Sequence, residues 1–62
     1  MEGEKRWEVI AWIENEDGTL KKVEFFIITD YEEIYEEVWE QAHNEILKEH
    51  GPYYQLQVWE ID

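Results

Sequence analysis

Apolar and polar residues alternate on both sides of a short polar segment in the first half of the chain. Residues 6–14 and 19–28 each have the pattern of a β-strand, because successive strand side chains point to opposite faces. Asn15 suits the first position of a type I turn, and Gly18 suits the left-handed position that follows it. This predicts a three-residue hairpin loop closed by a glycine bulge, which pairs Asn15 with Thr19 and therefore Trp7 with Ile27.

This register gives the hairpin two faces, and both of them are apolar. One face carries Trp7, Val9, Ala11, Ile13, Val23, Phe25 and Ile27. The other carries Ile10, Trp12, Leu20, Phe26 and Ile28, with Glu8, Glu14, Lys22 and Glu24 expected at the rim of this apolar patch. A two-residue loop at Asp17-Gly18 is the alternative, and it would mix the two sets of side chains. We prefer the bulged loop because it alone gives one uniformly apolar face.

A helical pattern follows the hairpin. Its apolar stripe consists of Tyr31, Ile34, Tyr35, Val38, Trp39, Ala42 and Ile46. Asp30, followed three residues later by Glu33, predicts a helix N-cap with a capping box. Gly51 and Pro52 predict that the helix ends at Glu49 or His50.

A third strand is predicted for residues 53–61. Tyr54, Leu56 and Val58 lie on one side of it, and Tyr53, Gln55, Gln57, Trp59 and Ile61 lie on the other. The helix returns the chain so that this strand runs antiparallel to the first. We therefore predict a single β-β-α-β domain over residues 1–62. It belongs to the α+β class, with an antiparallel sheet of order 2-1-3 and one helix packed on one face.

One helix covers only one face of such a sheet, so the other face is left without an internal partner. We predict that partner-binding residues gather there: Ile10, Trp12, Phe26, Ile28, Tyr53, Trp59, Ile61 and Glu24. Aromatic residues inside an apolar patch with a polar rim are typical of protein-binding surfaces. The alternative interpretation is that a chain of this size cannot hide every aromatic side chain.

The formal net charge of −12 narrows the choice of partner. It argues against direct binding to nucleic acid, because contacts with phosphates require Lys and Arg. It favours a basic protein as partner, or it serves only to keep the chain soluble. The helix contributes Glu32, Glu33, Glu36, Glu37, Glu40, Glu45 and Glu49. A functional interpretation is that these carboxylates mimic a nucleic-acid backbone or dock to a basic protein. The alternative is a solvated face of good helix formers.

Residues that carry catalysis are scarce. The chain contains neither Cys nor Ser, and Thr19 and Thr29 have no His nearby that would complete a triad. His43 close to Glu40, or one heptad from His50, offers too few converging ligands for a metal. We therefore expect no enzymatic activity, no cofactor and no metal site.

The sequence also bears on location. No apolar stretch approaches the roughly 20 residues that span a bilayer, so we expect no contact with a membrane. The start Met1-Glu2-Gly3-Glu4 is too acidic for a signal peptide, so we expect a cytoplasmic or purely recombinant protein that is not secreted.

Two resemblances follow from these residues. The matched turn at 15–19, the Asp30/Glu33 capping box and the Gly51-Pro52 stop resemble a de novo designed miniprotein, which implies a built scaffold or binder. The element order, the Trp7-x-Val9 opening and the acidic helix entry after Thr29 are similar to small acidic phage proteins that inhibit host enzymes, such as the phage T7 inhibitor of bacterial RNA polymerase. That similarity implies an inhibitor.

From the sequence we therefore predict a non-catalytic protein-binding module that presents an open aromatic sheet face. Trp12, Phe26, Tyr53 and Trp59 are the expected anchors. The alternatives are a homodimer formed by stacked open faces, and a natural phage-type inhibitor or nucleic-acid mimic that binds a basic host protein.

Overall fold

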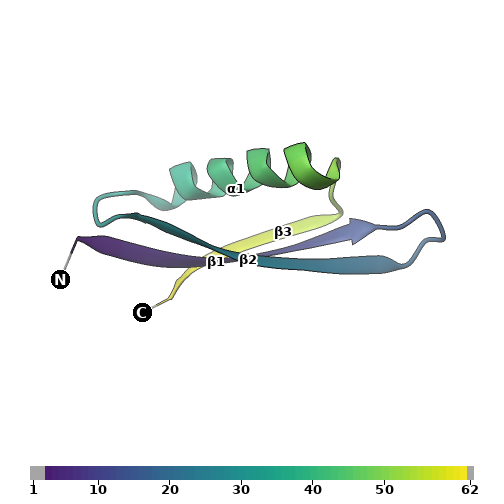
Figure 1. Cartoon of the computed structure of the whole chain (residues 1–62), viewed down its shortest axis with the longest axis horizontal. Helices are drawn as coiled ribbons and strands as arrows, with labels where there is room; N and C mark the ends of the chain where they lie inside the picture. The colour runs from purple at the N-terminus through teal and green to yellow at the C-terminus, as the bar shows by residue number, and fades with distance from the viewer. Residues whose placement is uncertain (1–2, 62) are drawn as a thin grey trace.

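The computed structural model describes residues 3–61, and Met1, Glu2 and Asp62 lie outside the described residues. The elements follow in the order β1 (Glu4–Glu14), β2 (Leu20–Asp30), α1 (Tyr35–His50) and β3 (Gln55–Ile61). The strands form one antiparallel sheet in the order β2-β1-β3, and α1 lies along one of its faces (Figure 1). The predicted α+β fold and its 2-1-3 sheet order are therefore confirmed.

The hairpin loop has the predicted bulged geometry. The Asn15 N–H donates to the Thr19 carbonyl at 2.7 Å, and the Gly18 N–H donates to the Asn15 carbonyl at 3.0 Å. Gly18 has a φ of 90°, which favours glycine over any other residue. Asp17 accepts both the N–H and the hydroxyl of Thr19. The loop sets the β1–β2 register, with Trp7 opposite Ile27 as predicted.

The entry into the helix differs from the prediction. Asp30 is not a helix N-cap, because β2 continues through it and pairs it with Glu4. The Tyr31 N–H then donates to the Gly3 carbonyl at 3.0 Å. Where a capping box was expected the chain makes a turn, in which the Glu33 N–H donates to the Asp30 carbonyl at 3.1 Å. α1 begins at Tyr35, with Ile34 at the N-cap position and no side-chain capping bond. Continued pairing with β1 has outcompeted the local capping signal.

The exit from the helix follows the prediction more closely. Gly51 has a φ of 85°, and its N–H donates to the carbonyls of Ile46 and Leu47. The positive φ of Gly51 ends the helix just before Pro52, as predicted, although its ψ of −159° is not that of a left-handed helical residue. β3 begins at Gln55, two residues later than predicted, because the chain first bends through residues 51–54.

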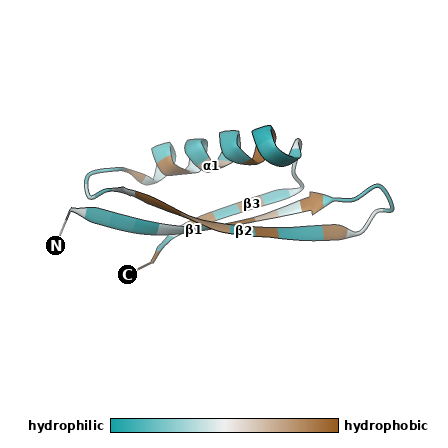
Figure 2. Cartoon of the chain, in the orientation of Figure 1, coloured by the Kyte–Doolittle hydropathy of each residue, from teal (hydrophilic) through white to brown (hydrophobic). Residues whose placement is uncertain are grey.

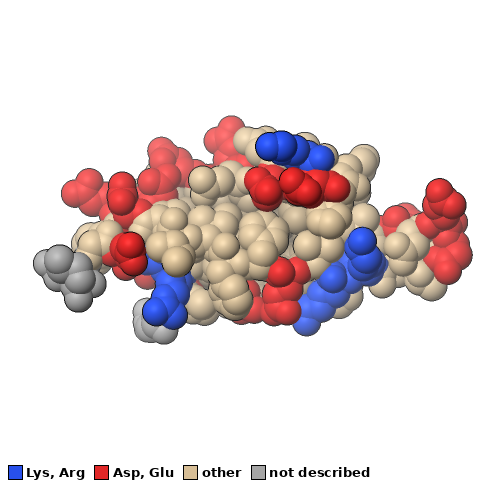
Figure 3. Space-filling view, in the orientation of Figure 1, with Lys and Arg blue, Asp and Glu red and all other residues tan. Residues whose placement is uncertain are grey.

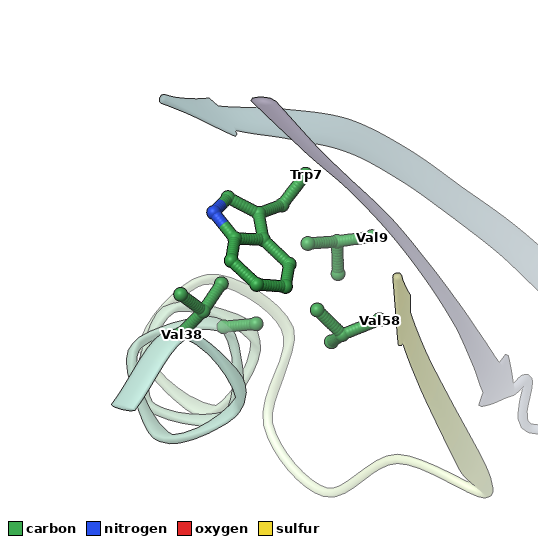
Figure 4. Packing of buried hydrophobic residues seen from close by; sticks show 5 residues of the cluster. Trp7, Val9, Val38 and Val58 are labelled. Atoms are coloured by element: carbon green, nitrogen blue, oxygen red, sulfur yellow. The ribbon is translucent and has the colours of Figure 1, made fainter. Parts of the chain in front are cut away.

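The core lies between α1 and the two strands β1 and β3. Trp7, Val9, Val38, Ala42 and Val58 form one buried cluster, and Ala11, Ile13 and Ile46 form a second. Figure 4 shows the Trp7 ring reaching from β1 toward Val38 on α1. Its indole N–H donates to the Thr29 hydroxyl at 2.8 Å, so the one polar atom of the ring is satisfied.

The two layers differ in length. A helix of 16 residues spans about 24 Å, whereas strands of 11 residues span about 36 Å. The molecule measures 45 × 18 × 15 Å, and the hairpin extends beyond the helix (Figure 1). Within β2, all of whose residues are described, every residue is exposed or half-buried. The helix therefore covers β1 and β3 better than β2, whose apolar segments are visible in Figure 2.

Candidate protein-binding face

The sheet surface opposite α1, here called the open face, is organised in rows across the three strands. The strand registers place Phe26, Glu8 and Trp59 in one row. The neighbouring rows are Glu24-Ile10-Gln57, Lys22-Trp12-Gln55 and Ile28-Arg6-Ile61. Because β1 is the central strand, Glu8 lies between two aromatic side chains rather than at the rim, where its sequence pattern had suggested it. Arg6, between Ile28 and Ile61, is a part of this face that the sequence analysis missed.

Large apolar side chains are exposed along the open face. Phe26 and Ile28 are each 60% exposed, and Trp59 is 38% exposed. Ile10 and Trp12 are half-buried because they lie on the central strand, between β2 and β3. Ile61 is half-buried next to Arg6 of β1. Seven of the eight predicted binding residues therefore lie on one surface, on which β2 and β3 supply the most exposed anchors.

Tyr53 is the exception among the predicted binding residues, and its predicted position on the open face is wrong. Its hydroxyl shares a hydrogen bond of 2.9 Å with Nδ1 of His43, on the helix side of the sheet. Its ring packs against the cluster that contains Ile46. The residue precedes β3 in the bend after Pro52, so the alternation of a strand does not apply to it.

Two carboxyl groups meet in the middle of the open face. Glu8 and Glu24 occupy adjacent rows, and a hydrogen bond between their side chains raises the pKa of Glu8 above its ordinary value of 4.5. Partial desolvation and the negative charge of Glu24 act in the same direction, whereas Lys22 and Trp59 oppose the shift. Two carboxylates close enough to share a hydrogen bond repel each other when both are ionised. A positive charge placed between them would relieve that repulsion.

The helix presents a different surface. Figure 3 shows acidic side chains above α1 and at the hairpin end, with a largely uncharged area in the middle of this view. A hydrogen bond with Glu37 raises the pKa of Glu33, and the charges of Glu37 and Asp30 add to the shift. The helix surface therefore combines these carboxylates with exposed apolar side chains such as Tyr35 and Leu47.

The flank of α1 next to Tyr53 holds a shallow cavity of about 480 Å³, lined by Tyr35, Glu36, Trp39, Glu40 and His43. His43 stacks on Trp39 with ring centroids 5.2 Å apart, and it also bonds to Tyr53. These contacts give His43 a packing role. Among residues 3–61, no group of three or more His, Cys, Asp or Glu side chains is placed to hold a metal ion.

Comparisons of the chain with protein-family models, with curated proteins and with solved structures find no match. The resemblances to designed miniproteins and to phage inhibitors therefore stay predictions. In the described part of the chain, the helix is neither long nor apolar enough to cross a membrane. The surface itself is what indicates a function.

Proposed function

We propose that this chain is a non-catalytic protein-binding module and that its open face docks a partner protein. The observation that carries the proposal is the row Phe26-Glu8-Trp59, in which two exposed aromatic rings flank a carboxyl group. Binding energy at interfaces concentrates in aromatic side chains that become fully desolvated, with polar groups fixing the orientation. Ile28 and Ile10 extend the apolar area on either side of this row.

The chemistry of the face specifies a partner that carries Arg or Lys among apolar side chains. A guanidinium or ammonium group seated between Glu8 and Glu24 would neutralise the repulsion between these two carboxylates. It would also lie within reach of Trp59, whose ring face attracts cations. The net charge of −12 would speed the approach of a basic protein over longer distances.

Selection from a random-peptide display library against the immobilised chain tests this proposal. We expect the selected peptides to combine Arg or Lys with aromatic or branched aliphatic residues. Trp59→Ala and Phe26→Ala should each weaken their binding by about fivefold or more, the loss that defines a substantial interface contact. Tyr54→Ala is the matched control, because Tyr54 is 69% exposed but lies beside Ile13 and His50, away from the open face. It should leave binding unchanged.

A second pair of variants separates specific recognition from general attraction to an acidic chain. Glu24→Gln and Glu40→Gln change the net charge equally, but only Glu24 lies on the open face. We expect Glu24→Gln alone to weaken the selected peptides. Equal weakening by both variants, together with full binding to Trp59→Ala, would instead favour a nucleic-acid mimic that acts through the helix carboxylates.

A further inference from the structure

The outer edge of β2 has no strand beside it. In the described residues 3–61, β2 has β1 as its only neighbour. Two backbone hydrogen bonds mark the ends of the hairpin: the Asn15 N–H donates to the Thr19 carbonyl, and the Tyr31 N–H donates to the Gly3 carbonyl. They show that the odd-numbered residues of β2 direct their backbone groups to β1. Because these directions alternate in an antiparallel pair, the even-numbered residues from Lys22 to Asp30 direct their N–H and C=O groups to the free edge.

The middle of this edge lacks the features that usually prevent strand pairing, although charged residues flank it at Lys22, Glu24 and Asp30. Exposed edges are commonly blocked by proline, by a bulge or by charges that point inward. The segment Phe25-Phe26-Ile27-Ile28-Thr29 contains no proline and no charge, and its ladder with β1 is regular. On the helix side, Phe25 and Ile27 are only half-buried, so β2 is incompletely covered on its inner face as well as on the open face.

We infer that β2 pairs antiparallel with β2 of a second copy of this chain, forming a continuous six-stranded sheet. In the inferred register, Phe26 lies on the two-fold axis opposite its own counterpart, and Glu24 lies opposite Ile28 of the second copy. Lys22 then lies opposite Asp30 of the second copy, and the symmetry makes this ion pair twice. Even-numbered residues occupy the hydrogen-bonded positions, as the free edge requires.

Charge distinguishes this register from its neighbours. Placing Phe25 on the axis puts Lys22 opposite Ile28 and removes the ion pairs. Placing Ile27 on the axis sets Glu24 opposite Asp30, and like charges directly opposite each other are destabilising. Placing Val23 on the axis does pair Lys22 with Glu24, but it leaves Ile27 and Ile28 outside the overlap. β3 carries Glu60 and no basic residue, so pairing β3 with itself offers no ion pair.

The helices leave room for this assembly. The buried residues of α1 pack mainly on β1 and β3, and β2 adds only half-buried side chains at the margin of this core. The two β1 strands would lie about 14 Å apart, three strand spacings, and helices set further outward would not collide. On the helix side, each copy has a cavity of about 250 Å³ next to Phe25 and Ile46. In the paired assembly, the two cavities would lie between the two helices. Pairing the edges would enclose Phe25 and Ile27 of both copies on this side.

Edge pairing leaves the open face of each copy uncovered. The inference is therefore independent of the proposed function, and it places two open faces side by side on one surface. It also differs from a dimer made by stacking open faces. Trp59→Ala would remove a stacking contact, but it would leave an edge-paired dimer intact.

Charge-reversal variants at Lys22 and Asp30 test the inference. Sedimentation equilibrium over about a hundredfold range of protein concentration measures the fraction of dimer, because that fraction depends on concentration. At physiological salt, where the Debye length is about 8 Å, we expect the wild-type chain to dimerise. Lys22→Asp and Asp30→Lys, each alone, should weaken the dimer by about tenfold or more, because two attractions become two repulsions. Both residues are exposed, so the fold should persist, as circular dichroism would show.

Mixing the two single variants gives the sharpest result. In a mixed dimer, the aspartate introduced at position 22 of one copy lies opposite the lysine introduced at position 30 of the other. The second site keeps the original pair of Lys22 and Asp30, so we expect the heterodimer to form where neither variant dimerises alone. Lys21→Asp is the matched control, because Lys21 directs its backbone groups to β1, and it should leave the dimer unchanged.

Several results would overturn the inference. They are a wild-type monomer at every concentration, single variants that dimerise like the wild type, or a mixture with no preference for the heterodimer. Restoration by Glu24→Lys instead of Asp30→Lys would overturn the register centred on Phe26 in favour of the one centred on Val23.

Discussion

β1 and β2 have the same length and similar apolar content, but their surroundings differ. β1 buries Trp7, Val9, Ala11 and Ile13, whereas every residue of β2 is exposed or half-buried. The difference comes from position, because β1 has a strand on each side and the helix above it. β2 has a single neighbouring strand and lies toward the margin of the helix. The apolar residues of β1 that face the helix are therefore buried in the core, whereas the apolar residues of β2 all stay at least partly exposed.

Replacing Trp7 by alanine should destabilise the fold strongly, whereas replacing Trp59 by alanine should leave it folded. Trp7 is 4% exposed and Trp59 is 38% exposed. Trp7→Ala should lower the free energy of unfolding by about 3–5 kcal/mol, the range for large aromatic truncations in a core. Trp59→Ala should cost about 1 kcal/mol or less. Urea denaturation followed by circular dichroism measures both changes.

A chain of 62 residues has a total stability of only about 3–9 kcal/mol, so Trp7→Ala is expected to be largely unfolded. Trp7→Phe then serves as a milder variant that loses the hydrogen bond to Thr29 but keeps a ring. Equal destabilisation by the alanine variants of Trp7 and Trp59 would contradict the contrast between a buried core and an open face.

A second matched pair compares β1 with β2 on the same side of the sheet. Val9 is fully buried, and Val23 is half-buried on the helix side of β2. Val9→Ala should cost about 2 kcal/mol, because two buried methyl groups are lost and a cavity remains. Val23→Ala should cost about half as much or less. A larger loss at Val23, measured by the same denaturation, would mean that β2 is covered more fully than described.

The hairpin loop sharpens the comparison because it sets which β2 residues face the helix. A Cβ at Gly18 would meet nothing within 4 Å, but the residue has a φ of 90°. Gly18→Ala should therefore lower the free energy of unfolding by about 1 kcal/mol through backbone strain alone. NMR of the variant should show unchanged cross-strand contacts between Trp7 and Ile27. A shifted register would show that the bulged loop cannot form with alanine at position 18.

The smallest effect concerns pH. The pKa of Glu8 is raised above 4.5 by its hydrogen bond to Glu24. The hydrogen bond of protonated Glu8 therefore contributes to the free energy of unfolding fully below pH 4.5. This contribution is lost as the pH rises through the raised pKa. Glu24→Gln should lower the pKa of Glu8 in an NMR titration and slightly increase stability at neutral pH. A pKa of Glu8 that does not change in this variant would contradict the contact.

Asp17 provides an internal reference with the opposite sign. Hydrogen bonds from the Thr19 hydroxyl and N–H lower the pKa of Asp17 below its ordinary value of 3.8. Its contribution to stability is present above pH 3.8 and is lost as the pH falls through the lowered pKa. Thr19→Val should remove the hydroxyl bond and shift the pKa of Asp17 upward, without changing the titration of Glu8.

Much of this fold is encoded in local signals that agree with one another. The turn at Asn15 and Gly18 predicted the register, and Gly51 predicted the helix end. The signals failed where a longer-range contact competed with them. Asp30 has the residue type of an N-cap but remains paired with Glu4, and Tyr53 alternates with its neighbours but precedes the strand and bonds to His43. The central position of Glu8 became visible only with both strand registers.

Amide hydrogen exchange of β2, followed by NMR at low protein concentration, tests the central claim most directly. If β2 is an uncovered edge strand, the N–H groups of Val23, Phe25 and Ile27 should exchange slowly, because they bond to β1. Those of Lys22, Glu24, Phe26 and Ile28 should exchange rapidly and become protected as the concentration rises. Slow exchange of both sets in the dilute protein would show that the edge of β2 is already covered, and it would contradict the difference between β1 and β2.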